Sequence, residues 1–448
     1  MRIVAAVAAL AVLAGTGTAS AATRTFVARI GPIKMDAYET RQASDAAPAP
    51  RIDGHVTRMH ARIVDAAGRP VPQQRVMLHH VFFMNYGRFP GDRRGGDCEP
   101  RRAETFYGTG EEDQAIDLPP GYGYRVRRKD RWRVGWMFMN HQPRAETVYL
   151  QYRFEVTDEP GLTDVKPYWI SVSCHRNKIY SVPGDGGPGA VHRRSRIWVA
   201  PRGGRIVAAG AHAHGGALGV SVSEPRCGRR LLTSTARYGA ADDPIYQLSP
   251  VLHEPAPRSM SVLTTPTGWP IRRGDRLRIT SIYGNEHQHS AVMGIMHLYV
   301  AAGGARTERC PPPPEDVSEH RLAFPGAPGR DRPPLVTPQL SALDDAGVAR
   351  PLADLAGPLR VLRGDATVSV AAVQFRPRKL SIPRGATVRW RFQDPIQHDV
   401  TLASGPRAFA SAYLDRGATY RRRFTVPGEY RVFCSLHPVV MSQIVRVR

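Results

Sequence analysis

Residues 432–441 read VFCSLHPVVM, and this stretch decides the fold of the last part of the chain. Its apolar start is typical of the end of a strand, and a tight loop after Cys434 then returns His437 and Met441 toward the thiol. His398 lies far upstream in the segment QHDV, so only the folded chain can bring it to the same point. We therefore expect His398, Cys434, His437 and Met441 to form one site at the end of a β-sheet.

These four side chains have the chemistry of an electron-transfer copper site. Two imidazoles and a thiolate, with a weak axial thioether, bind copper in trigonal geometry. Thiolate and thioether sulfurs suit Cu(I) and imidazole suits both oxidation states, so little rearrangement accompanies the movement of an electron. Structural zinc sites favour four His or Cys ligands without methionine. The sequence therefore predicts a type 1 (blue) copper that cycles between Cu(I) and Cu(II).

The C-terminal segment also carries the pattern of a β-sandwich. Residues 388–392 read VRWRF and alternate with the period of a half-buried strand. With the ligand order His, Cys, His, Met, the segment 359–448 resembles the plastocyanin, amicyanin and pseudoazurin family. The resemblance implies a Greek-key cupredoxin β-sandwich that exchanges single electrons with a redox protein partner. The spacing between His437 and Met441 departs from the usual family spacing, which concerns the axial ligand alone.

The composition of the whole chain favours an all-β protein with many turns. The sequence has 448 residues with 42 glycines and 39 prolines, and long helical periodicity is hard to find. From residue 55 to about residue 300, short apolar runs alternate with Gly, Pro and Asp turns, a spacing typical of sandwiches and not of βαβ units. This stretch has room for one large or two smaller β domains.

The first residues are typical of a secretory signal. Arg2 precedes an apolar run at 3–13 that is too short to span a bilayer, and residues 19–21 read ASA, which fits the small-residue cleavage rule. No later stretch approaches about 20 apolar residues, so we expect no transmembrane segment. The mature chain is therefore expected to begin at Ala22 and to be exported, to the periplasm or outside the cell.

The cysteine count predicts disulfides in an exported chain. Of the five cysteines, Cys434 has metal-ligand neighbours, which leaves Cys98, Cys174, Cys227 and Cys310 to form two bridges. Four cysteines allow three pairings, and the sequence leaves all three open.

The formal net charge of +23 comes almost entirely from arginine. The arginines are scattered, and no dense basic run is interleaved with aromatic residues, so the sequence lacks the footprint of a nucleic-acid-binding protein. A positive field of this size steers acidic partners toward the protein. The redox partner is therefore expected to be acidic, and no nucleic acid is expected.

Histidine motifs mark a second candidate metal site in the N-terminal region. Residues 211–216 read AHAHGG, so His212 and His214 point to the same face of a strand. Met293 lies at the entry to a later apolar strand, and two histidines plus a methionine suit Cu(I). His79 and His80 are adjacent in an apolar strand, where regular geometry points them to opposite faces and does not favour a shared metal.

The order of these motifs resembles the copper core of peptidylglycine α-hydroxylating monooxygenases and dopamine β-monooxygenases. With the stretches FYGTG at 106–110 and LPPGYG at 118–123, the region resembles the stress up-regulated nodulin-type domain more closely. The likeness covers about residues 55–300. It implies two packed β-sandwiches, with two coppers facing each other across a cleft.

The monooxygenase resemblance also implies roles for individual side chains. It assigns His212, His214 and Met293 to an oxygen-activating copper. It assigns His79 and His80 to an electron-supplying copper.

The same resemblance implies a third histidine beside the electron-supplying pair. The matching strand at 149–153 reads YLQYR and has no histidine. His141 and His175 are the alternatives, and neither is placed by the sequence. This gap leaves an enzymatic role open.

These observations together predict an all-β chain with the following segments: a signal peptide at 1–21, an N-terminal arm at 22–54, a first β-sandwich at 55–198, a second at 199–303, a Pro-rich linker at 304–358 and a cupredoxin domain at 359–448.

Three functions fit this chain. The first is electron transfer by the cupredoxin domain, to an external partner or to the N-terminal copper. The second is a copper-dependent monooxygenase-like enzyme with a fused electron donor. The third is copper sequestration or delivery without turnover. A complete second copper site in the N-terminal region favours the enzyme, and one copper per chain favours simple electron transfer.

Overall fold

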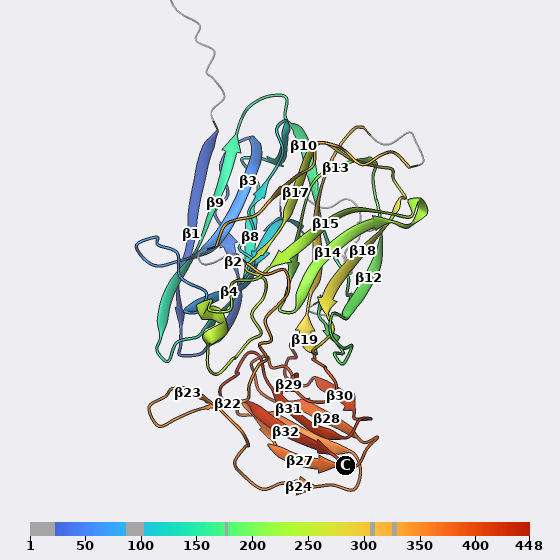
Figure 1. Cartoon of the computed structure of the whole chain (residues 1–448). Helices are drawn as coiled ribbons and strands as arrows, with labels where there is room; N and C mark the ends of the chain where they lie inside the picture. Colours follow the sequence, from blue (N-terminus) through green and yellow to red (C-terminus); the bar gives the residue numbers. More distant parts are fainter. Residues whose placement is uncertain (1–22, 87–102, 175–177, 305–309, 325–328) are drawn as a thin grey trace, which may run out of the picture.

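The computed structural model describes residues 23–86, 103–174, 178–304, 310–324 and 329–448. These residues form strands and turns with the short 3-10 helices η2 (Pro225–Cys227) and η3 (Pro244–Gln247), and no α-helix occurs among them. Figure 1 shows two sandwiches side by side and a third, in orange and red, below them. The prediction of an all-β chain built from β-sandwiches is confirmed.

The first sandwich packs two antiparallel layers around an aromatic core. One layer has the order β1 (Arg24–Met35), β9 (Glu146–Thr157), β3 (Gly54–Val64) and β7 (Tyr122–Val126), with β6 (Ile116–Asp117) paired to β3. The other layer has the order β2 (Thr40–Ala47), β8 (Trp132–Asn140), β4 (Val76–Asn85) and β5 (Glu104–Gly110).

The second sandwich continues the larger layer of the first, because β7 pairs in parallel with β10 (Thr163–Ser171). From β10 the sheet runs on through β20 (Gly294–Ala301), β13 (Gly204–Ala213), β17 (Val262–Ile271) and β21 (Ser318–His320). The facing layer has the order β12 (Val191–Val199), β18 (Arg276–Gly284), β14 (Ala217–Glu224), β15 (Arg229–Arg237) and β16 (Ser259–Met260). A small pair, β11 (Tyr180–Val182) and β19 (His289–Val292), lies beside it.

The shared sheet places the junction of the two sandwiches earlier than the predicted boundary at residue 198. β10 and β12 pair with β20 and β18, so they belong to the second sandwich although they precede that boundary. This junction could not be predicted, because no composition shift or long linker separates β9 from β10.

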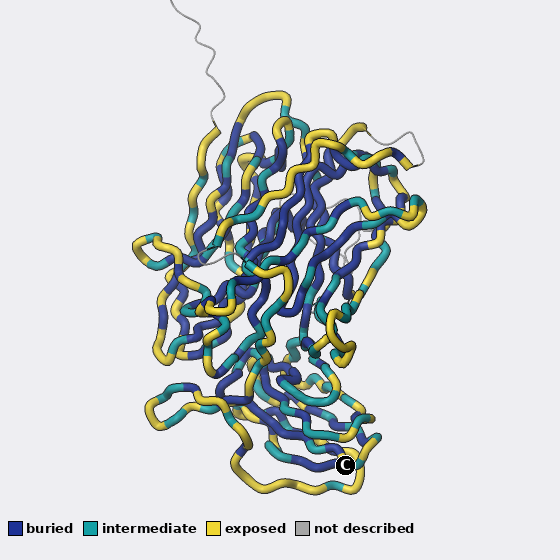
Figure 2. Tube along the Cα trace, viewed as in Figure 1, coloured by how far each residue is buried: buried dark blue, intermediate teal, exposed yellow. Residues whose placement is uncertain are grey.

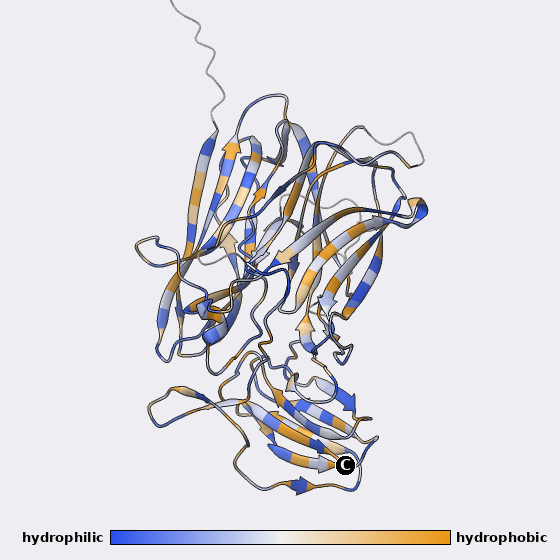
Figure 3. Ribbon diagram, in the orientation of Figure 1, coloured by the Kyte–Doolittle hydropathy of each residue, from blue (hydrophilic) through white to orange (hydrophobic). Residues whose placement is uncertain are grey.

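The C-terminal sandwich has two layers. One has the order β24 (Arg360–Val361), β27 (Lys379–Ile382), β32 (Ser442–Val447), β31 (Gly428–Phe433) and β29 (Thr401–Ser404). The other has the order β26 (Gln374–Arg376), β25 (Ala366–Ala371), β28 (Thr387–Phe392) and β30 (Thr419–Arg423). Val388, Trp390 and Phe392 point into the core of this sandwich, as their alternation predicts. Figure 3 shows hydrophobic and hydrophilic residues alternating along its strands.

Two segments are more ordered than their composition indicates. The predicted arm contains β1 and β2, which pair with β9 and β8. β1 is an edge strand with mostly exposed side chains, so its sequence lacks the apolar run of a buried strand. The predicted linker contains β21 and the hairpin of β22 (Ser341–Leu343) and β23 (Ala349–Pro351).

The C-terminal sandwich is docked on the other two through a small apolar cluster. Val439, from the loop between β31 and β32, is buried with Tyr38, Met77, Met139 and Leu252. Figure 2 shows exposed residues gathered in the loops and buried residues in the middle of the layers. The loop that carries the predicted C-terminal ligands therefore faces the N-terminal sandwiches.

Three of the described cysteines are disulfide-bonded and one is a free thiol. Cys227 and Cys310 form a disulfide, Cys174 is disulfide-bonded as well, and Cys434 is a buried free thiol. Cys98 and the predicted signal peptide lie outside the described residues. Within the described part of the chain, no helix has the length and hydropathy that a membrane span requires.

Candidate metal centres

The ligand atoms of the C-terminal site lie at the corners of a small triangle. His398 Nδ1 is 3.2 Å from His437 Nδ1, and Cys434 Sγ is 3.8 Å from the first nitrogen and 3.5 Å from the second. A metal at about 2.0–2.3 Å from each atom, the usual range for nitrogen and sulfur ligands, fits a triangle of this size. Met441 is fully buried in the same core cluster as Cys434. This donor set fits copper.

The sheet and its loop position these side chains. Cys434 follows the last residue of β31, and its N–H donates to the carbonyl of Met441 at 3.0 Å, which closes the loop. The N–H of His437 donates to the carbonyl of Cys434 at 3.1 Å. His398 is held just before β29 by paired backbone bonds with Leu414, at 2.8 and 3.2 Å.

Asp394 orients His398 from outside the ligand triangle. Its Oδ2 lies 2.9 Å from His398 Nε2, which leaves Nδ1 to face the thiol. The same carboxylate accepts the N–H groups of Ala372 and Val373 at 2.7 and 2.8 Å. A carboxylate behind a ligating imidazole fixes its tautomer and raises its basicity. Sequence reasoning missed Asp394, although a carboxylate four residues before a ligand histidine is a usable signal.

Burial shifts the pKa values of Cys434 and His437 in opposite directions. It raises the pKa of the Cys434 thiol well above its usual value, and the nearby Asp399 carboxylate adds to this shift. A bound cation reverses the effect, because a coordinating thiol is deprotonated. Burial, with a smaller contribution from His398, lowers the pKa of His437 to about 4. That imidazole is therefore neutral at neutral pH and has a lone pair for a metal.

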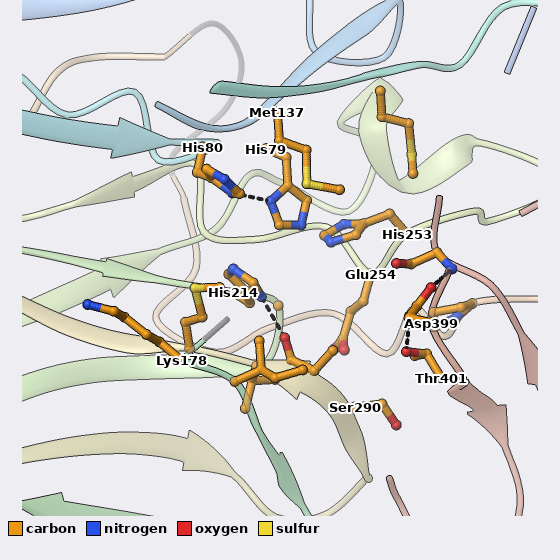
Figure 4. A pocket seen from close by; sticks show the side chains of 18 of the residues that line it. His79, His80, Met137, Lys178, His214, His253, Glu254, Ser290, Asp399 and Thr401 are labelled. Atoms are coloured by element: carbon orange, nitrogen blue, oxygen red, sulfur yellow. Dashed lines mark hydrogen bonds between the residues drawn. The ribbon is translucent and has the colours of Figure 1, made fainter. Parts of the chain in front are cut away.

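The N-terminal histidine motifs converge on one cavity of about 350 Å³, which the C-terminal sandwich helps to line. Figure 4 shows His79, His80, His214 and His253 around a common space, with Asp399 at its side. The ring centroid of His79 lies 4.9 Å from that of His214 and 4.7 Å from that of His253. The imidazoles that the resemblance assigns to two coppers thus line one cavity, with neighbouring rings packed against each other.

The rings of His212 and His214 are held in the same way, each by a hydrogen bond at Nδ1. His212 Nδ1 lies 3.0 Å from Glu112 Oε1, and His214 Nδ1 lies 3.0 Å from the carbonyl of Ala291. The Nε2 atom of each ring is buried without a hydrogen-bond partner among the described residues. Each imidazole is therefore fixed from behind and has one nitrogen available to a metal.

Met293 lies beside this pair. The last registered partners of β13 and β20 are Ala213 and Gly294, so His214 and Met293 flank the end of the ladder on neighbouring strands. Met293 also lines the cavity. His212, His214 and Met293 therefore all line the cavity, near one end of the β13–β20 ladder.

A β-bulge changes the relation of His79 to His80. The register between β4 and β8 shifts between Leu78 and His80, so both rings line the cavity, with their Nδ1 atoms 3.0 Å apart. Regular strand geometry, which would point them to opposite faces, is therefore the wrong expectation here. Burial lowers the pKa of His80 to about 3, so its imidazole stays neutral.

Two further residues join His79 that the sequence did not indicate. The ligand atoms of His79, Glu111 and His253 all lie within 4.8 Å of one another. His253 comes from the loop between η3 and β16, and Glu111 directly follows β5. His141 is buried but does not line the cavity, and His175 lies outside the described residues.

Comparison with known proteins supports both predicted resemblances. Residues 363–448 match the family of copper binding proteins of the plastocyanin/azurin type, and residues 126–303 match the family described as stress up-regulated Nod 19. The chain is 28% identical over 85 residues to amicyanin-alpha of Methylorubrum extorquens. The matched region covers 18% of this chain and 71% of that protein. The resemblances to the plastocyanin family and to the stress up-regulated nodulin-type domain are confirmed.

Solved amicyanin structures match the same region. A Cu(I) form of an amicyanin variant is 24% identical, with 19% of this chain and 82% of that chain covered and a TM-score of 0.18. The oxidised form of another amicyanin variant is 26% identical. That match covers 19% of this chain and 83% of the amicyanin chain, with a TM-score of 0.18. The copper-binding resemblance of the C-terminal domain rests on the family match over residues 363–448 and on the amicyanin-alpha relative.

Proposed function

We propose, on the premise that residues 363–448 form a copper-binding domain of the plastocyanin/azurin family, that this protein carries single electrons through a type 1 copper. The observation that carries the proposal is the triangle of His398 Nδ1, Cys434 Sγ and His437 Nδ1. Copper held by these three residues, with Met441 as a fourth ligand, would supply one-electron chemistry. The backbone hydrogen bonds from Cys434 to Met441 and from His437 to Cys434 hold the loop that carries three of these ligands.

The test uses the oxidised, copper-loaded mature protein. It is expected to be blue, and Cys434→Ser is expected to lose the blue band because the thiolate ligand is gone. Ser435→Ala changes the neighbouring side chain, leaves the ligands intact and is expected to stay blue. A Cys434→Ser protein that kept its colour would refute the proposal.

A second copper in the N-terminal cavity is part of the same proposal. His212, His214 and Met293 supply two imidazoles and a thioether, and both Nε2 atoms are buried without a partner among the described residues. A His212→Ala/His214→Ala double variant is expected to lose one copper per chain and to remain blue. Unchanged copper content in that variant would rule out this second site.

The docking of the two halves supports electron exchange within the chain. Val439 of the ligand loop is buried against the N-terminal sandwiches, and the cavity is lined from both sides. An acidic external protein remains a second partner class, since the chain carries a net charge of +23. The signal-like first residues and the Cys227–Cys310 disulfide support export to the periplasm or beyond.

A monooxygenase-like activity is the second candidate, because the histidine-lined cavity of about 350 Å³ has room for a small molecule. Such an enzyme consumes O₂ only when an oxidisable small molecule is present. Oxygen uptake by the copper-loaded protein with ascorbate, measured across a panel of small aromatic and aliphatic compounds, tests this role. Uptake that no compound stimulates leaves electron transfer or copper storage, and stable one-electron cycling of the blue band then separates those two.

A further inference from the structure

The N-terminal cavity contains more metal-binding side chains than one copper needs. We propose that a second metal ion lies beside the copper of His212 and His214, bound by His79, Glu111 and His253, so that the cavity holds a close copper pair. The inference rests on the proposed function for the first of these two ions. The monooxygenase resemblance implied a second copper at His79 and His80, whereas the ligand set with Glu111 and His253 and the close pairing are new.

The ligand atoms of the second site already lie together. Those of His79, Glu111 and His253 are within 4.8 Å of one another, close to the spread that a single bound ion imposes on its ligands. The register of β4 and β5 pairs His80 with Gly110, which places Glu111 opposite His79. His79 is thus held within β4, and Glu111 follows the last registered pair of the ladder.

Glu111 is a buried carboxylate with one oxygen to spare. Its Oε2 accepts the N–H of Ala256 at 3.0 Å, and its Oε1 has no hydrogen-bond partner among the described residues. Oε1 lies 3.6 Å from His253 Nδ1, which also has no hydrogen-bond partner there. The side chain of Glu111 is 1% exposed. Burial of unpartnered groups is costly, and a cation between these two atoms would satisfy both.

The two sites are in contact. The rings of His79 and His214, one from each ligand set, have centroids 4.9 Å apart. His253 and His214 are 6.3 Å apart by the same measure. Because rings of the two ligand sets pack against each other, the proposed ions would be neighbours within one cluster of imidazoles, and ions about 3.5–4 Å apart are the known arrangement of two-metal sites.

Buried carboxylates offset the charge of two cations. Glu111 belongs to one ligand set, and Glu112 stands behind the other through His212. Glu112 is fully buried. Neighbouring residues of one turn therefore bring one negative charge to each ion, where solvent cannot.

The donor sets predict which oxidation state each ion favours. Two imidazoles with a carboxylate suit Cu(II), and two imidazoles with the thioether of Met293 suit Cu(I). The pair is thus built asymmetrically. Zinc also binds two histidines and a glutamate, so metal analysis has to identify the second ion.

The experiment measures copper content and the electron paramagnetic resonance of the fully oxidised full-length protein. We expect about three coppers per chain, with fewer spins than copper ions or a half-field signal, because paired Cu(II) ions couple. Glu111→Gln keeps the shape of the side chain and is expected to lose one copper and the coupling. His253→Ala is expected to do the same.

Matched controls separate site loss from misfolding. Glu146→Gln and His55→Ala replace buried residues of the same types that belong to neither proposed ligand set, at 5% and 3% exposure, and should keep the full copper content. The blue band serves as the internal folding control in every variant.

The results that overturn the inference are distinct from those that overturn the proposed function. Two coppers per chain that Glu111→Gln and His253→Ala leave unchanged, with one lost in the His212/His214 variant, would refute the pair alone. Zinc in the second site would refute it as well. No loss of copper in the His212/His214 variant would refute the proposed function first.

Discussion

Replacing Asp394 with asparagine tests the type 1 site from outside its ligand set. The carboxylate lies 2.9 Å from His398 Nε2 and also accepts two backbone N–H groups. Asparagine keeps the shape and one acceptor oxygen but removes the charge. Loss of such a partner typically lowers metal affinity about 10–100-fold, which corresponds to about 1.4–2.8 kcal/mol. We expect a loss in this range for Asp394→Asn.

The same change has a predictable effect on the reduction potential. The carboxylate makes the imidazole a stronger donor, which favours Cu(II) over Cu(I). Removing the charge is therefore expected to raise the potential. A chelator competition titration measures the affinity, and a redox titration of the blue band measures the potential.

A neighbouring aspartate provides the control. Asp415 accepts a hydrogen bond from Gln397, the residue directly before His398, at 2.9 Å. Among the described residues, Asp415 makes no hydrogen bond to the His398 ring. Asp415→Asn is expected to leave both quantities unchanged. If Asp394→Asn bound copper as tightly as the original chain at an unchanged potential, the role assigned to this carboxylate would be wrong.

Three other predictions concern the stability and docking of the domains. Trp390 is fully buried in the C-terminal core, so Trp390→Ala is expected to cost about 3–5 kcal/mol in denaturant unfolding of that domain. The Cys227–Cys310 bridge closes a separation of 83 residues, so the double alanine variant is expected to lose up to about 4–5 kcal/mol by calorimetry, and an unchanged melting temperature would contradict this. Val439→Asp puts a charge into the docking cluster and should expand the protein in X-ray scattering while the blue band persists, whereas Val440→Asp, at a position that is 45% exposed, should do neither.

The C-terminal site was predictable because its ligands are mostly local in sequence. Cys434, His437 and Met441 come from one loop between two strands, and only His398 had to be brought from elsewhere. The alternation around Trp390 predicted β28, which belongs to the layer that faces the strands joined by that loop. Chemistry and periodicity indicated the same fold independently.

The N-terminal cavity was predictable only in part. His212 and His214 share a strand face, as the i and i+2 spacing requires. His79 and His80 share the cavity because of a β-bulge, and a bulge has no signature in this sequence. His253 comes from an irregular loop, so its arrival beside His79 depends on the whole tertiary fold.

The docking of the ligand loop through Val439 has a kinetic consequence. A donor and an acceptor carried on one chain meet without a diffusional encounter, at an effective concentration that a tether alone sets at about millimolar. Electron exchange between the two ends of this chain should then be first order in protein, and its rate constant should not change on dilution. The surface charge would affect only the slower, bimolecular exchange with a separate carrier, which alone should depend on ionic strength.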